Sequence, residues 1–67
     1  MNVKWRFFAR HPNLWKGERC LALGSEALSA EEARTKCAQL AYCYEGSTDA
    51  RIEVAGDAAG VIAKKRN

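Results

Sequence analysis

Apolar and polar residues follow two different periods along this chain, and the changes of period mark the elements of a small mixed fold. After Ser29, apolar residues recur every three or four positions, which is the spacing of one face of a helix. On both sides of that segment, apolar and polar residues alternate one by one, as in strands that have one buried face. The pattern therefore predicts strands, then a helix, then strands.

The predicted helix spans about residues 30–45 and carries signals at both ends. Ser29 followed by Glu32 is a capping box, in which the hydroxyl accepts from the Glu32 amide and the carboxylate accepts from the Ser29 amide. Glu31 and Glu32 also place negative charge at the positive end of the helix dipole. Gly46 can adopt the left-handed conformation that ends a helix. The apolar stripe consists of Ala30, Ala33, Cys37, Leu40, Ala41 and Tyr44.

Two strands are predicted before the helix. Residues 3–7 alternate between apolar and basic side chains, and Phe8 breaks the alternation by falling on the basic side. Residues 10–17 contain a proline and a glycine, which favour a long loop. Residues 19–23 form the second strand, with a bulge or bend at Gly24. These segments predict a hairpin with an aromatic residue near its tip.

Two further strands follow the helix, at residues 50–54 and 61–65, with a turn at 56–60 between them. The order is therefore ββαββ in a single domain, residues 1–67. We expect an α+β fold: a four-stranded, mainly antiparallel sheet with one helix packed on one face. The predicted core consists of Val3, Trp5, Phe7, Leu21, Leu23, Leu28, Ala33, Cys37, Leu40, Tyr44, Ile52, Val54 and Ile62.

Charge is distributed unevenly along the 67 residues. Residues 1–20 hold five basic side chains against Glu18 alone, and residues 21–60 hold three basic side chains against seven acidic ones. The tail adds Lys64, Lys65 and Arg66. If the two ends of the chain pair in space, the folded molecule is basic on one side and acidic on the other. A polarised potential of this kind steers association with charged partners, so it indicates a binding protein.

The residue inventory argues against an enzyme and against a bound metal or other cofactor. His11 is the single histidine and precedes Pro12 in a loop, with no serine or cysteine tied to it by a known motif, so we expect an exposed turn residue. The three cysteines form no C-x-x-C pair, and their odd number argues against a closed disulfide framework. We expect Cys20, Cys37 and Cys43 to be reduced core residues. A reactive thiol or a bridge between chains is the alternative.

No segment of the chain has the continuous apolar stretch of a signal peptide. None reaches the roughly 18 apolar residues of a membrane span. We therefore expect a cytoplasmic protein without a membrane partner.

The first strand supplies the first candidate binding surface. With a regular pleat, one face carries Lys4, Arg6, Phe8 and Arg10, and the last strand and tail add Lys64, Lys65 and Arg66. A sheet face that mixes cations with an aromatic ring fits phosphates and stacked bases. It equally fits a protein partner, or the plain solubility of an open sheet.

Trp15, next to Leu14 in the predicted loop, is the second candidate. Exposed tryptophan is a common anchor residue in protein interfaces. A loop that folds back would instead let Trp15 plug one end of a small core. The sequence leaves both alternatives open.

Two local signatures suggest a resemblance. One is residues 27–33 (ALSAEEA), which lead into the helix, and the other is residues 60–65 (GVIAKK), a final strand that ends in a basic run. With the element order, they resemble small phage and mobile-element ββαββ proteins, some of which are anti-CRISPR inhibitors of type I CRISPR–Cas surveillance complexes. The resemblance covers residues 18–66. It implies a non-enzymatic inhibitor whose candidate contacts are Lys36, Arg51, Lys64 and Lys65.

The leading hypothesis is therefore a small binding protein that inhibits a host protein or ribonucleoprotein complex by occupying a charged surface. The alternative is a sequence-nonspecific nucleic-acid-binding protein that uses a basic sheet face, whose affinity falls steeply with salt. A third class is a homodimeric scaffold joined through an edge strand or Cys43. The sequence does not decide between a monomer and a homodimer.

Overall fold

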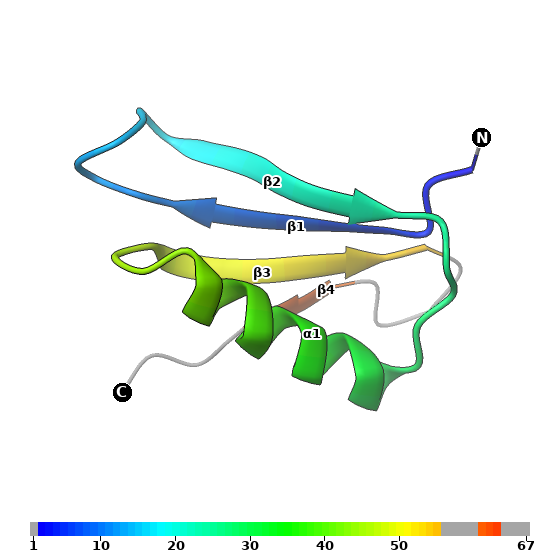
Figure 1. Ribbon diagram of the computed structural model, residues 1–67. Helices are drawn as coiled ribbons and strands as arrows, with labels where there is room; N and C mark the ends of the chain where they lie inside the picture. The colour runs from blue at the N-terminus through cyan, green and yellow to red at the C-terminus, as the bar shows by residue number, and fades with distance from the viewer. Residues whose placement is uncertain (1, 56–60, 64–67) are drawn as a thin grey trace.

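The computed structural model describes residues 2–55 and 61–63, and it places one helix against an antiparallel sheet (Figure 1). The elements in chain order are β1 (Trp5–Arg10), β2 (Glu18–Gly24), α1 (Ala30–Cys43), β3 (Thr48–Val54) and the short β4 (Val61–Ala63). The predicted α+β class, with one helix on one face of an antiparallel sheet, is confirmed. The predicted turn at 56–60 and residues 64 and 65 of the predicted last strand lie outside the described residues.

The strand order is β2-β1-β3-β4, and every neighbouring pair is antiparallel. β3 therefore lies between β1 and β4, and the first and last strands are not neighbours (Figure 1). The prediction of one basic side built from both ends of the chain assumed that the first and last strands pair with each other. They do not pair, so the basic residues of β1 are considered without those of the tail.

The capping box at the start of α1 is present as predicted. The Glu32 amide donates to Ser29 Oγ at 3.1 Å, and the Ser29 amide donates to Glu32 Oε1 at 2.9 Å. The hydrogen bonds from the Ser29 amide and hydroxyl hold the pKa of Glu32 below its usual value. The helix ends at Cys43 with Tyr44 as its C-cap, slightly before the predicted end, and Gly46 follows with φ +90°. The local signals therefore place the helix within two residues.

The core lies between α1 and the two central strands, β1 and β3. Its buried residues are Trp5, Phe7, Ala9, Ala33, Cys37, Ala50, Ile52 and Val54. Leu21, Ala22, Leu28, Leu40, Ala41 and Tyr44 pack against this cluster while partly exposed. Gly24 lies directly against the indole of Trp5, since a Cβ at this glycine would stand 2.5 Å from Trp5 Nε1. Gly24 is thus required by the close approach of Trp5 and is not the site of the bulge in β2.

The bulge in β2 falls at Leu21 and changes which residues are buried. Phe7 is paired with Ala22 and Phe8 with Cys20, so Leu21 is the extra residue of the strand. Ala22 therefore packs against the core, whereas Leu23 is 58% exposed. The prediction that Leu23 is a core residue is wrong for this reason.

A second bulge lies between β1 and β3. Phe8 is paired with Arg51 and Arg10 with Thr48, so two residues of β3 stand opposite Ala9. One of them, Asp49, has a positive φ of 55°. Ala9 is fully buried because β1 runs to Arg10, three residues beyond the predicted end of the strand.

The cysteines divide between the core and the surface, and none of the three forms a disulfide bond. Cys37 is buried, as predicted, but Cys20 and Cys43 are exposed, so the prediction of three core cysteines is wrong. Cys43 follows Cys37 by six residues, which turns it away from the buried stripe of the helix. The described helix α1 has 14 residues and lacks the length and apolar character needed to cross a membrane.

Candidate functional site

The sheet has one face against α1 and one face that none of the described elements covers. Along β1 and β3 buried residues alternate with exposed or half-buried ones, and the register aligns the two strands. We call the uncovered side the open face. It consists of Arg6, Phe8 and Arg10 from β1, Glu18, Cys20 and Leu23 from β2, and Arg51 and Glu53 from β3.

The centre of the open face is an ion-pair network around Arg51. Its Nε and Nη2 donate to Glu18 Oε2 and Oε1, each at 2.8 Å, and Nη1 donates to Glu53 Oε2 at 2.5 Å. Glu18 lies on β2 and Arg51 on β3, so the side-chain bridge passes over β1. A two-point bond between guanidinium and carboxylate fixes orientation as well as charge. The network therefore gives the open face a defined geometry.

The ring of Phe8, on β1, packs against the Arg51 guanidinium of this network. The Arg51 guanidinium carbon lies 4.2 Å from the centre of the Phe8 ring, which is the geometry of a cation–π contact. Hydrogen bonds from Arg51 hold the pKa of Glu18 below its usual value, and bonds to Glu18 and Glu53 raise the pKa of Arg51. Arg51, a candidate contact by the resemblance, thus lies on the open face, where it is already paired with two carboxylates.

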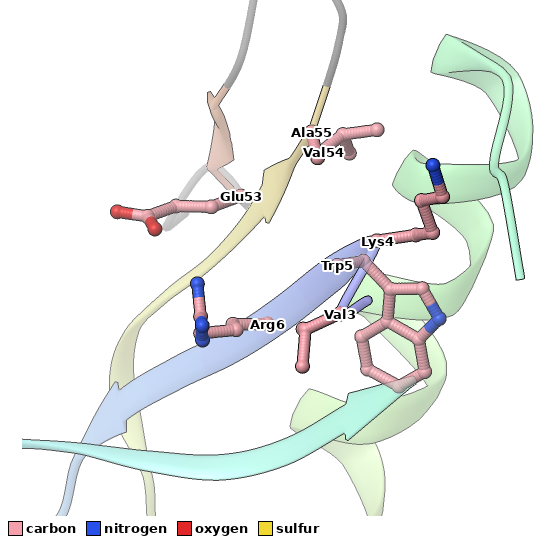
Figure 2. A pocket seen from close by; sticks show the side chains of 7 residues that line it. All are labelled: Val3, Lys4, Trp5, Arg6, Glu53, Val54 and Ala55. Carbon is pink, nitrogen blue, oxygen red and sulfur yellow. The ribbon is translucent and has the colours of Figure 1, made fainter. Parts of the chain in front are cut away.

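Arg6 differs from Arg51 in having no ion-pair partner among the residues that the structure describes. Figure 2 shows Arg6 and Glu53 extending to the same side of the sheet and Trp5 to the other. Among the described residues no carboxylate lies within 4.0 Å of the Arg6 guanidinium, since Glu53 bonds to Arg51. A hollow of about 190 Å³ lies beside Arg6, between the start of β1 and the end of β3. Arg6 is therefore a cation that remains available to a partner.

Arg10, at the other end of β1, is intermediate. Its Nε lies 4.0 Å from an Asp49 carboxylate oxygen, at the outer limit of an ion pair, and both side chains are mostly exposed. An exposed pair at this distance contributes little to stability and is easily exchanged for another partner.

Two other predicted residues that the structure describes, Lys4 and Lys36, do not lie on the open face. Figure 2 shows the Lys4 side chain extending away from Arg6. Lys36 lies on α1, with Nζ 5.0 Å from the ring centre of Trp5, whose Nε1 donates to Glu26 Oε1 at 2.9 Å. Lys64, Lys65 and Arg66 lie outside the described residues. The predicted set is therefore dispersed, and Arg6, Phe8, Arg10 and Arg51 are the members that share one surface.

The loop after β1 folds back on the strand. Trp15 is half-buried, and its Nε1 donates to the carbonyl of Ala9 at 3.3 Å. Its ring contacts the His11 ring at 5.2 Å between centres and the Arg19 guanidinium at 5.5 Å. The loop thus folds back and holds Trp15 against Ala9, His11 and Arg19, but Trp15 is not among the residues that pack against the core cluster.

His11 is also half-buried, so the expectation of an exposed turn residue is wrong. Its Nε2 lies 3.2 Å from the carbonyl oxygen of Glu45, and its ring packs against Gly46. The ring joins the β1–β2 loop to the turn after α1, which accounts for its burial.

The sequence analysis missed Glu18, Glu53, Cys20 and Leu23 as members of the open face. Glu53 was detectable, because it stands two residues after Arg51 in a strand and therefore shares its face. Glu18, Cys20 and Leu23 were not, because their positions depend on the register and bulge of β2.

The described part of the chain holds no cluster of three or more histidine, cysteine, aspartate or glutamate residues that could bind a metal ion. The Arg51 network is held together by three side-chain hydrogen bonds, and it lies on the open face, where a partner could contact it. In the comparisons with known proteins, no family model, no curated protein and no solved structure matches this chain.

Proposed function

We propose that this is a non-enzymatic binding protein whose open face docks on a protein surface of a larger complex. The observation that carries the proposal is the arrangement of Arg51 over Phe8 between two carboxylates, with exposed Leu23 and the unpaired Arg6 beside it. Aromatic residues and arginine are enriched in protein interfaces, and a mixed-charge rim provides specificity.

The charge of the open face favours a protein over a nucleic acid. A phosphate backbone is bound by cations that lack carboxylate neighbours. Here Glu18 and Glu53 stand at the centre of the face, where they would repel phosphates, and Arg51 is already paired with them. A protein partner with charges of both signs can pair with Arg6 at one end and Glu53 or Glu18 at the centre.

The resemblance to small phage proteins suggests what such a partner is. It implies that the target is a host ribonucleoprotein assembly of the type I CRISPR–Cas surveillance class, inhibited by occupation of one of its protein surfaces. The second candidate function is sequence-nonspecific nucleic-acid binding through Arg6 and Arg10, which are the cations of the open face that make no close ion pair.

The test is capture of partners by tagged protein from host lysate, with and without nuclease, washed at about 0.5 M salt to screen surface charge. The wild type is compared with Arg6→Glu on the open face. Arg34→Glu is the matched control, since Arg34 is exposed on α1, on the other side of the sheet, and its charge changes equally.

A protein complex that survives nuclease and salt, is lost with Arg6→Glu and is kept with Arg34→Glu supports the proposal. The presence of surveillance-complex subunits would identify the target class. Recovery of nucleic acid alone, lost at high salt, contradicts the proposal and favours the second candidate. A complex kept equally by both variants also contradicts it, because the contact then lies elsewhere.

A further inference from the structure

The second strand is the least covered element of the described fold. β2 stands at one end of the strand order and pairs with β1 alone. The helix packs against β1, β3 and β4 and leaves β2 outside its footprint, so β2 runs along the edge of the sheet farthest from α1 (Figure 1). None of its seven residues is buried. The strand therefore has a free edge, and only Leu21 and Ala22 of its residues pack against the core.

The free edge of β2 has few of the features that block strand pairing. An edge strand of an antiparallel sheet points alternate N–H and C=O groups outward, where they can pair with another strand. Proteins commonly block such edges with lysine, proline or inward-pointing charges. The four central residues, 20–23, contain none of these; the segment has the bulge at Leu21, and the Leu21 carbonyl already accepts from the Tyr44 hydroxyl at 3.3 Å. Leu23 adds an exposed apolar side chain beside the edge.

The charges at the two ends of β2 suit a second copy of the same strand. Arg19 lies at the beginning of β2, and Glu26 lies two residues after its end. Neither has an ion-pair partner within 4.0 Å among the described residues; Arg19 lies over the Trp15 ring, and Glu26 accepts a hydrogen bond from Trp5 Nε1. Antiparallel pairing about a two-fold axis places the Arg19 end of one strand at the Glu26 end of the other, at both ends of the interface. Like charges are then separated by about the strand length, roughly 20 Å.

We infer that the protein forms a two-fold dimer in which β2 pairs antiparallel with β2 of a second copy. The sheet then runs continuously through both molecules, with the apolar residues 20–23 at the middle of the contact and Arg19 opposite Glu26 at each end. The two open faces come to lie on one continuous surface. This inference does not depend on the partner proposed above, because it concerns backbone pairing along the edge of β2, although Leu23 belongs both to that edge strand and to the open face.

The test is sedimentation equilibrium of the full chain from low micromolar to near-millimolar concentration. The wild type is expected to change from the mass of one chain to that of two. Leu23→Lys is expected to weaken the association about tenfold or more, because it places a charge beside the edge. Leu14→Lys is the matched control: Leu14 is 70% exposed at the hairpin loop, and the chemical change is the same. Circular dichroism verifies that both variants are folded.

A charge exchange tests the orientation of the two strands. Arg19→Glu alone is expected to weaken the dimer, because it faces Glu26 of the second copy, and Arg19→Glu combined with Glu26→Lys is expected to restore it. Hydrogen exchange should show β2 amides becoming slower at high concentration. A single-chain mass throughout, equal loss with Leu14→Lys, no rescue, or β2 amides that remain fast in a dimer would each overturn the inference.

Discussion

The two faces of one sheet are built on different principles. On the helix side, Phe7 and Ile52 are fully buried against α1, and no polar or charged side chain is buried among the described residues. On the open face, Arg51 is held by two glutamates over one aromatic ring, all of them accessible to solvent. Burial of apolar area stabilises the first face, whereas exposed ion pairs stabilise the second only slightly. The open face can therefore be substituted at small cost to the fold, which is what a binding surface requires.

The largest expected effect comes from the helix side. Phe7→Ala removes a ring with zero exposure, and such changes cost about 3–5 kcal/mol. This is as much as the whole stability that a core of this size supplies, so the variant should be unfolded. Ile52→Val should cost about 0.5–1.5 kcal/mol and remain folded. Urea unfolding followed by circular dichroism measures both.

The matched substitution on the open face is Leu23→Ala. Because Leu23 is mostly exposed, we expect this substitution to change the free energy of unfolding of the protein by less than about 0.5 kcal/mol. A loss for Leu23→Ala comparable to that for Ile52→Val would contradict the distinction between the two faces.

The same distinction explains which parts of the fold were predictable from the sequence. Features that depend on a few neighbouring residues were predicted correctly. The capping box of Ser29 and Glu32 predicted the start of α1, and the alternation of apolar and polar residues around Ile52 predicted the strand β3. Arg51 and Glu53 share a face for the same local reason. These features depend on spacing along the chain, which the sequence states directly.

Features that depend on strand pairing were not predictable. The extra residue in β2 moved Leu23 out of the core, and no local pattern indicates that Leu21 is the bulged position. The bond between Glu18 and Arg51 joins residues 33 positions apart across an intervening strand. The position of β3 between β1 and β4, which keeps the first and last strands from being neighbours, was likewise not predictable. Register and strand order are properties of the assembled sheet.

A smaller effect is expected at the start of α1, on neither face of the sheet. Ser29→Ala removes the hydroxyl that accepts from the Glu32 amide, and loss of such a cap costs about 1 kcal/mol. The variant Ser29→Thr keeps an acceptor and serves as the control. Thermal unfolding should show a lower midpoint for the alanine variant and a nearly unchanged one for threonine. Equal losses in both would mean that the site is sensitive to shape and not to the hydrogen bond.

The effect expected from the Arg51 network is also small and depends on pH. Arg51 lowers the pKa of Glu18 in the folded protein below the usual value of 4.5, so the ion pair contributes stability above about pH 4.5 and loses it as the pH falls through the lowered pKa. Because both groups are partly exposed, Glu18→Gln should cost only a few tenths of a kcal/mol, up to about 1, at neutral pH. The difference from the wild type should shrink towards zero at an acidic pH below the lowered pKa of Glu18, because the carboxylate is then protonated in both the folded and the unfolded state. Urea unfolding at neutral and at acidic pH measures this difference in stability. Glu31→Gln is the control for a general change of charge, since Glu31 lies on the exposed side of α1. A difference that stays constant with pH would show that Glu18 acts through packing, and the open face would then be held together in the same way as the helix side.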